Sequence, residues 1–177
     1  VIVGDWQWSD AVLPFVVLAV FPFVEWMIHV FILHWRPRRV AGVMIDPVLA
    51  RKHREHHADP RITKLIFIPL QSLARAFAAA LLVAFVLIPR TGLGLTFLVT
   101  LFAIGVVYEW SHYLVHTDYK PKTRAYRHLY DNHRWHHYRN EHYWFGITST
   151  IGDQVLRTAP GRDDVPVSAT AKSLPAR

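Results

Sequence analysis

Three long apolar stretches constrain the fold of this chain more than any other feature of its sequence. They cover residues 11–33, 73–88 and 93–107, and each contains at most two ionisable side chains. A helix of about 20 apolar residues crosses the roughly 30 Å of hydrocarbon in a bilayer, and the first stretch alone reaches that length. Three such stretches would leave a small soluble bundle little polar surface. The sequence therefore predicts an integral membrane protein.

The connections between these stretches predict the rest of the architecture. Residues 89–92 read Pro-Arg-Thr-Gly, the composition of a tight turn, so the second and third stretches are expected to form a helical hairpin. The expected fold class is an all-α membrane protein with about three transmembrane helices and a cytoplasmic helical cap. Because the chain opens on Val1 rather than methionine, a fourth span or a cleaved signal peptide before it is compatible with the sequence.

The domain prediction follows from composition. Residues 1–158 are expected to form one membrane-embedded domain. Residues 159–177 are rich in Pro, Ala, Ser, Asp and Arg and show no apolar periodicity. Such a segment has too little apolar surface to offset its ordering entropy. We therefore expect a disordered C-terminal tail.

The distribution of charge predicts an orientation in the membrane. The chain carries 20 Lys and Arg against 13 Asp and Glu, a net charge of +7. Eight of the basic residues lie in 35–64 and ten from 117 onward, whereas the turn of the hairpin has only Arg90. The positive-inside rule then places both basic segments in the cytoplasm and the turn outside. This explanation of the basic excess leaves no reason to expect a nucleic-acid partner.

The chain contains no cysteine and twelve histidines. The absence of cysteine excludes disulfides, thiolate zinc sites, iron–sulfur clusters and cysteine nucleophiles. Any metal must therefore be held by histidine or carboxylate side chains. Ten of the histidines form four clusters with the spacings H-x4-H, H-x2-H-H, H-x3-H and H-x2-H-H: His29 and His34; His53, His56 and His57; His112 and His116; His133, His136 and His137.

Helix geometry gives these spacings a chemical meaning. Positions three and four apart share a helix face, so His53 lies over both His56 and His57. The two adjacent histidines diverge by about 100°, so one such turn offers nitrogens to two neighbouring metals. The last cluster has the same spacing. On an α-helix, His29 and His34 would be spread by roughly 140°, an arrangement suited to flanking two centres rather than chelating one.

The predicted topology brings the four clusters together. The first and third helices run in the same direction and carry histidines near their inner ends, while both H-x2-H-H clusters lie in inner segments. Ionisable residues at membrane depth are functional candidates by default. Ten histidines suit two metals with five ligands each. Imidazole binds zinc, copper, iron and nickel, and a buried dinuclear site beside lipid favours iron and oxygen chemistry.

Two carboxylates in the apolar stretches are expected to support the ligands. Glu25 lies four residues before His29, and Glu109 lies three before His112, each on the face of its histidine. A ligating histidine usually donates its other N–H to a carboxylate or carbonyl. We expect these two carboxylates to orient the neighbouring rings.

Four further residues near the clusters carry weaker signals. Asp131 and Glu141 flank the last cluster and have the same potential role, although loop carboxylates are usually solvated. His128 and His142 lie outside the four clusters. We do not expect either histidine to be a ligand.

The order of the four clusters resembles the fatty acid hydroxylase/sterol desaturase superfamily of membrane oxygenases. The resemblance covers roughly residues 25–158. The third cluster, in Glu109-Trp-Ser-His-Tyr-Leu-Val-His116, has an acid three residues before its first histidine, as is common in that family. After the last cluster, Phe145-Gly-Ile-Thr148 with Asp153 and Thr158 resembles the closing stretch of the family. The first and third spacings favour fatty acid or sphingolipid hydroxylases within it.

This resemblance implies a function and a set of cofactors. It implies a dinuclear iron centre, with zinc as an alternative occupant after purification, that uses O2 to insert one oxygen atom into a C–H bond of a membrane lipid. The ten clustered histidines are then the ligands, and Asp153 joins Glu25 and Glu109 as a residue beside them. With no cysteine and no Gly-rich nucleotide fingerprint, the chain must receive electrons from a separate cytochrome or ferredoxin.

Three other functions remain open at the level of sequence. A carotenoid or sterol hydroxylase or desaturase would use the same chemistry on another lipid, and hydroxylation and desaturation share their first hydrogen abstraction. A hydrolase would use two zinc ions to generate hydroxide. A non-catalytic subunit would keep the histidine shell as a structural module of a larger membrane complex.

Overall fold

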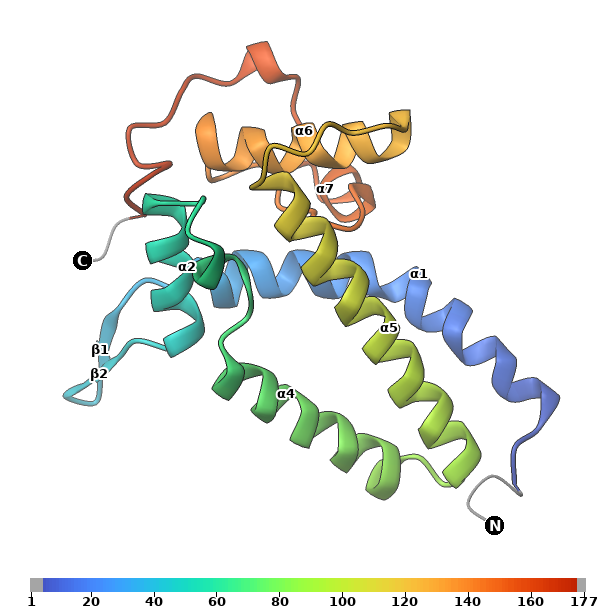
Figure 1. The fold of residues 1–177 in the computed structure, drawn as a ribbon. Helices are drawn as coiled ribbons and strands as arrows, with labels where there is room; N and C mark the ends of the chain where they lie inside the picture. Colours follow the sequence, from blue (N-terminus) through green and yellow to red (C-terminus); the bar gives the residue numbers. More distant parts are fainter. Residues whose placement is uncertain (1–4, 175–177) are drawn as a thin grey trace.

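The computed structural model describes residues 5–174 and is mostly helical (Figure 1). Its elements in chain order are η1 (Trp8–Ala11), α1 (Val12–Met27), η2 (Ile28–Leu33), β1 (Arg38–Val40), β2 (Val43–Ile45), α2 (Val48–Ala58), α3 (Thr63–Ile66), α4 (Leu70–Leu82), η3 (Val83–Leu87), α5 (Thr91–Val115), α6 (Arg124–Tyr138), α7 (Ile151–Val155) and η4 (Arg162–Asp164).

Three helical stretches are long and apolar enough to cross a membrane, as the sequence predicts. They are Trp8–Leu33, Thr63–Leu87 and Thr91–Val115, and their most apolar windows have mean hydropathies of 2.2, 1.9 and 2.0. At most 22% of each window is buried within the protein. Large apolar side chains such as Phe15, Phe77 and Phe102 therefore face outward. Outward-facing apolar surface is what a lipid-embedded helix requires.

The α4–α5 hairpin is closed by a tight approach of its two helices. A Cβ atom on Gly94 of α5 would lie 2.2 Å from the carbonyl oxygen of Ala84 in η3. Contact between these backbones therefore requires glycine at position 94. Gly105 on the same helix has no such neighbour within 4 Å.

The N-terminal segment meets the hairpin turn at one end of the spanning helices. The Asp5 carboxylate accepts hydrogen bonds from the backbone amides of Thr91 (2.8 Å) and Gly92 (2.6 Å), which satisfies free donors at the start of α5. Arg90 pairs with the buried Asp10 carboxylate. The N-terminal segment and the hairpin turn thus contact each other directly, at the end of the spanning helices opposite to α2 and α6 (Figure 1).

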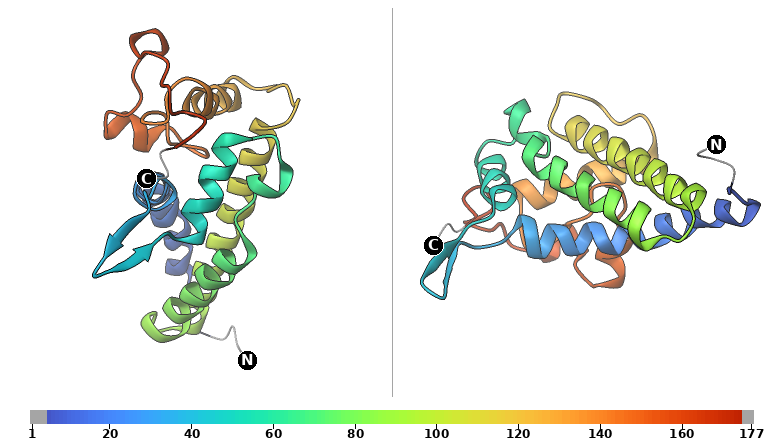
Figure 2. Two further views of the ribbon diagram at one scale, coloured as in Figure 1. Left: turned by 90° about the vertical axis from the view of Figure 1, so that its left-hand side faces the viewer. Right: turned by 90° about the horizontal axis from the view of Figure 1, so that it is seen from below.

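A short antiparallel hairpin is an addition to the all-α prediction. Strand β1 pairs with β2, with Val40 opposite Val43. Ala41 and Gly42 join the strands with positive φ angles of 48° and 82°, the values of a type I′ turn, which suits hairpins. The hairpin projects from the body of helices (Figure 2). In the sequence, the only indication of this hairpin was the pair Ala41-Gly42 between the β-branched residues Val40 and Val43.

Helices α2, α6 and α7 cover one end of the spanning helices, and the C-terminal segment runs across this cap (Figures 1 and 2). Here the structure differs from the disordered tail expected over residues 159–177. Val165, Ala171 and Leu174 of this segment are buried. Composition did not reveal these three anchoring side chains, which are spaced too irregularly to form a periodic pattern. Residues 175–177 lie outside the described part of the chain.

Candidate metal centre

The structure brings the ten clustered histidines together in two groups of five. In each group, one potential ligand atom from every residue lies within 4.8 Å of the others. Nine of the ten side chains are buried, and His34 is partly buried. Group A consists of His29, His34, His53, His57 and His136; group B consists of His56, His112, His116, His133 and His137. The groups are able to bind two metal ions, with five imidazoles each.

The two H-x2-H-H clusters are each divided between the groups, as helix geometry predicts. On α2, His53 and His57 belong to group A, whereas His56 belongs to group B. On α6 the division is reversed: His133 and His137 belong to group B, and His136 belongs to group A. Each helix therefore contributes to both groups, and neither group can form without both helices.

The first cluster behaves differently from the prediction. His29 and His34 were expected to flank two centres, but both belong to group A, with ring centroids 5.1 Å apart. The reason is the π-helical turn η2, in which the amide of His34 donates to the carbonyl of His29, 3.1 Å away. This i→i+5 hydrogen bond inserts one residue into the turn, so residues five apart share a face. H-x4-H on a π-helix is thus equivalent to H-x3-H on an α-helix.

The spacing of the ring nitrogens fits metal ligation. Four pairs of Nε2 atoms lie close together: His34 and His136 at 3.2 Å, and at 3.1 Å His53 and His57, His56 and His116, and His133 and His137. Two nitrogens bound to one ion at about 2.1 Å and at angles of about 90–110° would be about 3.0–3.4 Å apart. The observed pairs have this separation, and both members of each pair belong to the same group.

Backbone carbonyls fix the orientation of three rings in group A. The Nδ1 atoms of His29, His57 and His136 lie 2.6, 2.8 and 2.8 Å from the carbonyl oxygens of Phe145, Ala171 and Tyr143, respectively. A carbonyl can only accept, so each Nδ1 carries the proton and each neutral ring presents the lone pair of Nε2. The Nε2 atom of His29 is buried without a hydrogen-bond partner. This is the tautomer that a ligand bound through Nε2 requires.

Burial keeps these imidazoles in the neutral, ligating form. It lowers the pKa of His57 to about 4, although the carbonyl of Ala171 partly opposes this shift. Burial, with the nearby His112 and His57, lowers the pKa of His116 to about 2. The pKa values of His53, His133, His136 and His137 fall well below 6.5 for the same main reason. Neutral imidazoles bind metals without first releasing a proton.

The two intramembrane carboxylates hold loops rather than rings. Glu25 Oε1 accepts hydrogen bonds from the amides of Ile147 (2.7 Å) and Thr148 (2.9 Å), and Oε2 accepts from the Thr148 hydroxyl (2.5 Å). Glu109 Oε1 accepts from the amide of Ile68, 3.1 Å away. The expectation of direct contact with His29 and His112 is wrong, because a free backbone amide in each loop takes the carboxylate. Glu25 acts on His29 indirectly, through the loop whose Phe145 carbonyl orients that ring.

Asp153 makes a second set of hydrogen bonds to the loop that contains Phe145 and Gly146. Its carboxylate accepts hydrogen bonds from the amides of Phe145 (2.9 Å) and Gly146 (2.7 Å) and from the Thr158 hydroxyl (2.7 Å). Asn132, next to the last cluster, donates to Asp153 and to the Gly146 carbonyl. Burial raises the pKa of Asp153, against these hydrogen bonds. Asp153 therefore holds the loop that carries the two orienting carbonyls of Tyr143 and Phe145.

The weaker candidates have mixed outcomes. Neither His128 nor His142 belongs to group A or group B. His128 contacts the Thr150 hydroxyl at 3.3 Å, and the side chain of His142 is 57% exposed. Glu141 is not a solvated loop residue, because it is buried and accepts a hydrogen bond from the Thr170 hydroxyl. Sequence reasoning missed Thr170 because its only signal was a hydroxyl in a polar tail.

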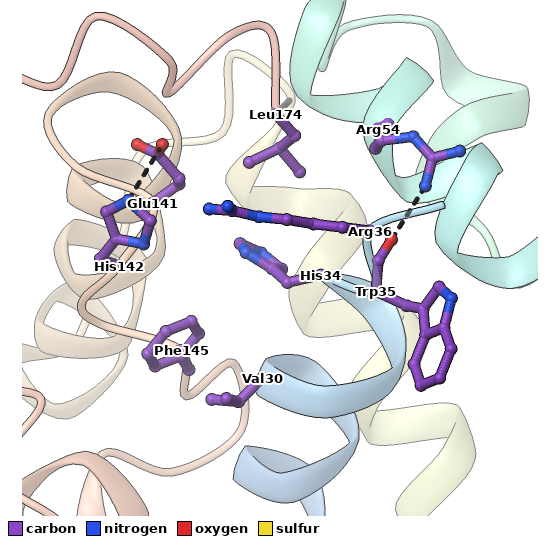
Figure 3. Close-up of a pocket in the computed structure, with 9 residues that line it drawn as sticks. All are labelled: Val30, His34, Trp35, Arg36, Arg54, Glu141, His142, Phe145 and Leu174. Atoms are coloured by element: carbon purple, nitrogen blue, oxygen red, sulfur yellow. Dashed lines mark hydrogen bonds and ion pairs between the residues drawn. The ribbon is translucent and has the colours of Figure 1, made fainter. Parts of the chain in front are cut away.

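Two cavities reach the histidines from different sides. The larger, of about 210 Å³, borders His34 (Figure 3). Its remaining lining is Val30, Trp35, Arg36, Arg54, Glu141, His142, Phe145 and Leu174. The smaller, of about 30 Å³, borders His53 of group A and His112 of group B, and its other walls are mostly apolar. The first therefore offers polar and charged partners beside group A, and the second offers an apolar approach to both groups.

Comparison with known proteins agrees with this geometry. Residues 14–158 match the model of the fatty acid hydroxylase family. The chain belongs to this family. The match covers all four histidine clusters, most of the three spanning stretches and the loop held by Glu25 and Asp153, and it ends before the C-terminal segment.

Individual relatives of this member of the fatty acid hydroxylase family are distant. A dihydroceramide fatty acyl 2-hydroxylase of Arabidopsis thaliana is 27% identical over 145 residues, covering 78% of this chain and 56% of the relative. The fatty acid 2-hydroxylase of Mus musculus is 28% identical over 145 residues, covering 77% and 36%, respectively. The solved hydroxylase domain of full-length Scs7p superposes with a TM-score of 0.73 at 25% identity, covering 93% of this chain and 61% of that one. This chain thus spans about a third to three fifths of these proteins.

Proposed function

We propose that this fatty acid hydroxylase family member is a di-iron membrane oxygenase that hydroxylates a fatty acyl chain of a lipid. The observation that carries this proposal is the pair of five-histidine groups that share α2 and α6. Group A would hold one iron and group B the other. Bound iron would supply the reductive activation of O2 and the oxidation of an acyl C–H bond, with electrons from a separate cytochrome or ferredoxin.

The chain's own residues would prepare the site for this chemistry. Burial keeps the imidazoles neutral, and the carbonyls of residues 143, 145 and 171 hold three rings with Nε2 directed inward. The loop clamped by Glu25 and Asp153 fixes two of these carbonyls in place. A site with rings held in this way needs little rearrangement when a ligand or metal arrives.

The apolar cavity supports a lipid chain as the substrate. It touches one histidine of each group, and Leu33, Ile66, Phe67 and Tyr108 are among its walls. An acyl chain that follows it from the bilayer would bring a methylene group between the two metal groups. A cavity with mostly apolar walls would also help to exclude competing reactions of a strong oxidant. The names of the Arabidopsis and mouse relatives support position 2 of a fatty acyl chain, in a free fatty acid or a sphingolipid.

The charge distribution supports an orientation with the histidine groups on the cytoplasmic side. Segments 35–64 and 117–174, which carry most of the basic residues, lie at the histidine end of the spanning helices (Figure 1), and the positive-inside rule favours this end in the cytoplasm. This basic surface would also suit an acidic electron-donor protein.

The test of the proposed function combines metal content with a reaction. After purification in mild detergent, metal analysis should give two ions per chain, and Mössbauer spectroscopy of iron-loaded protein should show two coupled irons. Cells that express the chain should accumulate hydroxylated acyl chains only when O2 is present. Lipid turnover without O2 or reductant would instead support a hydrolase, and oxidised sterols or carotenoids would contradict the acyl substrate.

A further inference from the structure

The C-terminal segment of residues 159–174, here called the strap, reaches the metal centre from outside the family match. It begins after α7, passes over the cap and ends near α2 (Figure 1). The match to the fatty acid hydroxylase family ends at residue 158. Burial of Val165, Ala171 and Leu174 fixes the strap on the cap. Leu174 also forms part of the wall of the larger cavity, beside His34 (Figure 3).

Hydrogen bonds join the strap to the residues that follow the last histidine cluster. Arg139 Nε donates to the carbonyl of Val165 at 2.8 Å, and the amide of Ser168 donates to the carbonyl of Arg139 at 2.7 Å. Asn140 Nδ2 donates to the carbonyl of Pro166 at 3.3 Å. These contacts place the strap in register with the end of α6, which carries histidines of both groups.

Thr170 and Glu141 form a further part of this contact. The Thr170 hydroxyl donates to Glu141 Oε1, and the amide of Thr170 donates to Ser168 Oγ at 3.1 Å. The Glu141 side chain is 1% exposed. A buried carboxylate needs such a donor, because an unpaired buried charge is costly. The position of Thr170 is therefore fixed by a hydrogen bond to a buried carboxylate.

The residue after Thr170 contacts a metal-group histidine. The carbonyl of Ala171 accepts a hydrogen bond from Nδ1 of His57 at 2.8 Å. His57 lies on α2 in group A. The strap thus connects α2 to the end of α6, the two helices that are divided between the groups. An outer hydrogen-bond partner of a ligating histidine commonly affects metal affinity by about 10- to 100-fold.

We infer that the strap is a working part of the metal centre: the Thr170–Glu141 contact holds the Ala171 carbonyl against His57 and thereby secures the metal in group A. This inference rests on the proposed function only in that both groups bind metal. Thr170 and Ala171 are positioning residues, because they act through His57 and touch neither metal nor substrate.

The experiment measures metal release from the full chain in three variants. Thr170→Val removes the hydroxyl that binds Glu141, Thr170→Ser keeps it, and Ser173→Ala removes an exposed hydroxyl from the same strap as a matched control. Metal release into excess chelator is followed over time. Thr170→Val should release one of its two metals about tenfold faster than the wild type, and the other at the wild-type rate. Thr170→Ser and Ser173→Ala should behave as wild type.

Single-group backgrounds identify which metal is affected. In a His112→Ala chain, which impairs group B, Thr170→Val should accelerate release of the remaining metal. In a His29→Ala chain, which impairs group A, the same substitution should have no effect. Equal release rates in wild type and Thr170→Val, or faster release from both groups with a lower unfolding temperature, would overturn the inference.

The results also separate this inference from the proposed reaction. A wild-type chain that holds two metals but oxidises no lipid would contradict the reaction, while the release rates would still decide the role of the strap. Thr170→Val with wild-type release and intact lipid hydroxylation would contradict the strap alone. A wild-type chain that binds no metal would contradict both.

Discussion

The Nε2 atoms of His56 and His116, sixty residues apart in the sequence, lie 3.1 Å from each other in the interior of the cap. On α2, His56 belongs to group B, whereas its neighbours His53 and His57 belong to group A. His116 follows directly after the spanning helix α5. The two rings therefore bring α2 and the end of α5 together at group B, which depends on a histidine from a helix that mainly serves group A.

This division of α2 and α6 predicts that one substitution on either helix inactivates the protein. His56→Ala removes a histidine from group B, and His136→Ala removes one from group A. Both should lower lipid hydroxylation by more than the roughly 10- to 100-fold typical of losing an outer hydrogen-bond partner. Mass spectrometry of acyl chains from expressing cells measures this. His142→Ala, at an exposed histidine outside both groups, should largely retain activity; an equal loss would contradict the division of ligands from bystanders.

The π-helical turn predicts an unusual tolerance to deletion. Removing Ile32 should convert η2 to an α-helical turn and place the two histidines of the first cluster four residues apart, on one face. Metal content should then stay close to two per chain.

Removal of Leu114 is the matched deletion, because it places the histidines of the third cluster three residues apart and rotates the chain after α5 by about 100°. That variant should lose metal from group B. If the Ile32 deletion lost as much metal as the Leu114 deletion, the π-turn would not be what aligns His29 with His34.

The role of Glu25 predicts a graded loss of stability. Glu25→Ala leaves the buried amide of Ile147 and the amide of Thr148 without an acceptor, at about 1–3 kcal/mol each. The free energy of unfolding should fall by about 3 kcal/mol, measured by denaturation in detergent. Glu25→Gln keeps one acceptor oxygen for these amides, so its free energy of unfolding should fall by less. Equal stabilities of wild type and Glu25→Ala would contradict the clamp.

The helical hairpin predicts different effects of two identical substitutions on α5. Gly94→Ala would force a methyl group to within 2.2 Å of the Ala84 carbonyl oxygen, so η3 and α5 must separate. Overpacking of this kind costs about 1–3 kcal/mol. Gly105→Ala meets open space and should be neutral or stabilising by up to about 1 kcal/mol. Thermal unfolding of the two variants in the same detergent compares them; a Gly105→Ala protein as unstable as Gly94→Ala would contradict the packing argument.

The sequence by itself predicted the apolar helical stretches and the division of each H-x2-H-H cluster between two groups. The apolar stretches 11–33, 73–88 and 93–107 coincide, to within one residue at Ile88, with parts of the helical stretches Trp8–Leu33, Thr63–Leu87 and Thr91–Val115, which are long and apolar enough to cross a membrane. The H-x2-H-H spacing predicted that one helical turn would serve two groups. Both features are local, because helix geometry fixes the direction of side chains three or four residues apart wherever the helix lies.

Only the tertiary structure decided the hydrogen-bond partners of the buried carboxylates and histidines. Glu25 binds the amide of Ile147, 122 residues away, instead of the nearby His29. His57 binds the carbonyl of Ala171, 114 residues away, in a segment that composition predicted to be disordered. The π-turn that aligns the first cluster also has no signature in the spacing itself. A hydrogen bond forms with whichever unpaired group the folded chain brings closest, and burial makes that choice strong, so these partners follow from packing between distant segments rather than from sequence neighbours.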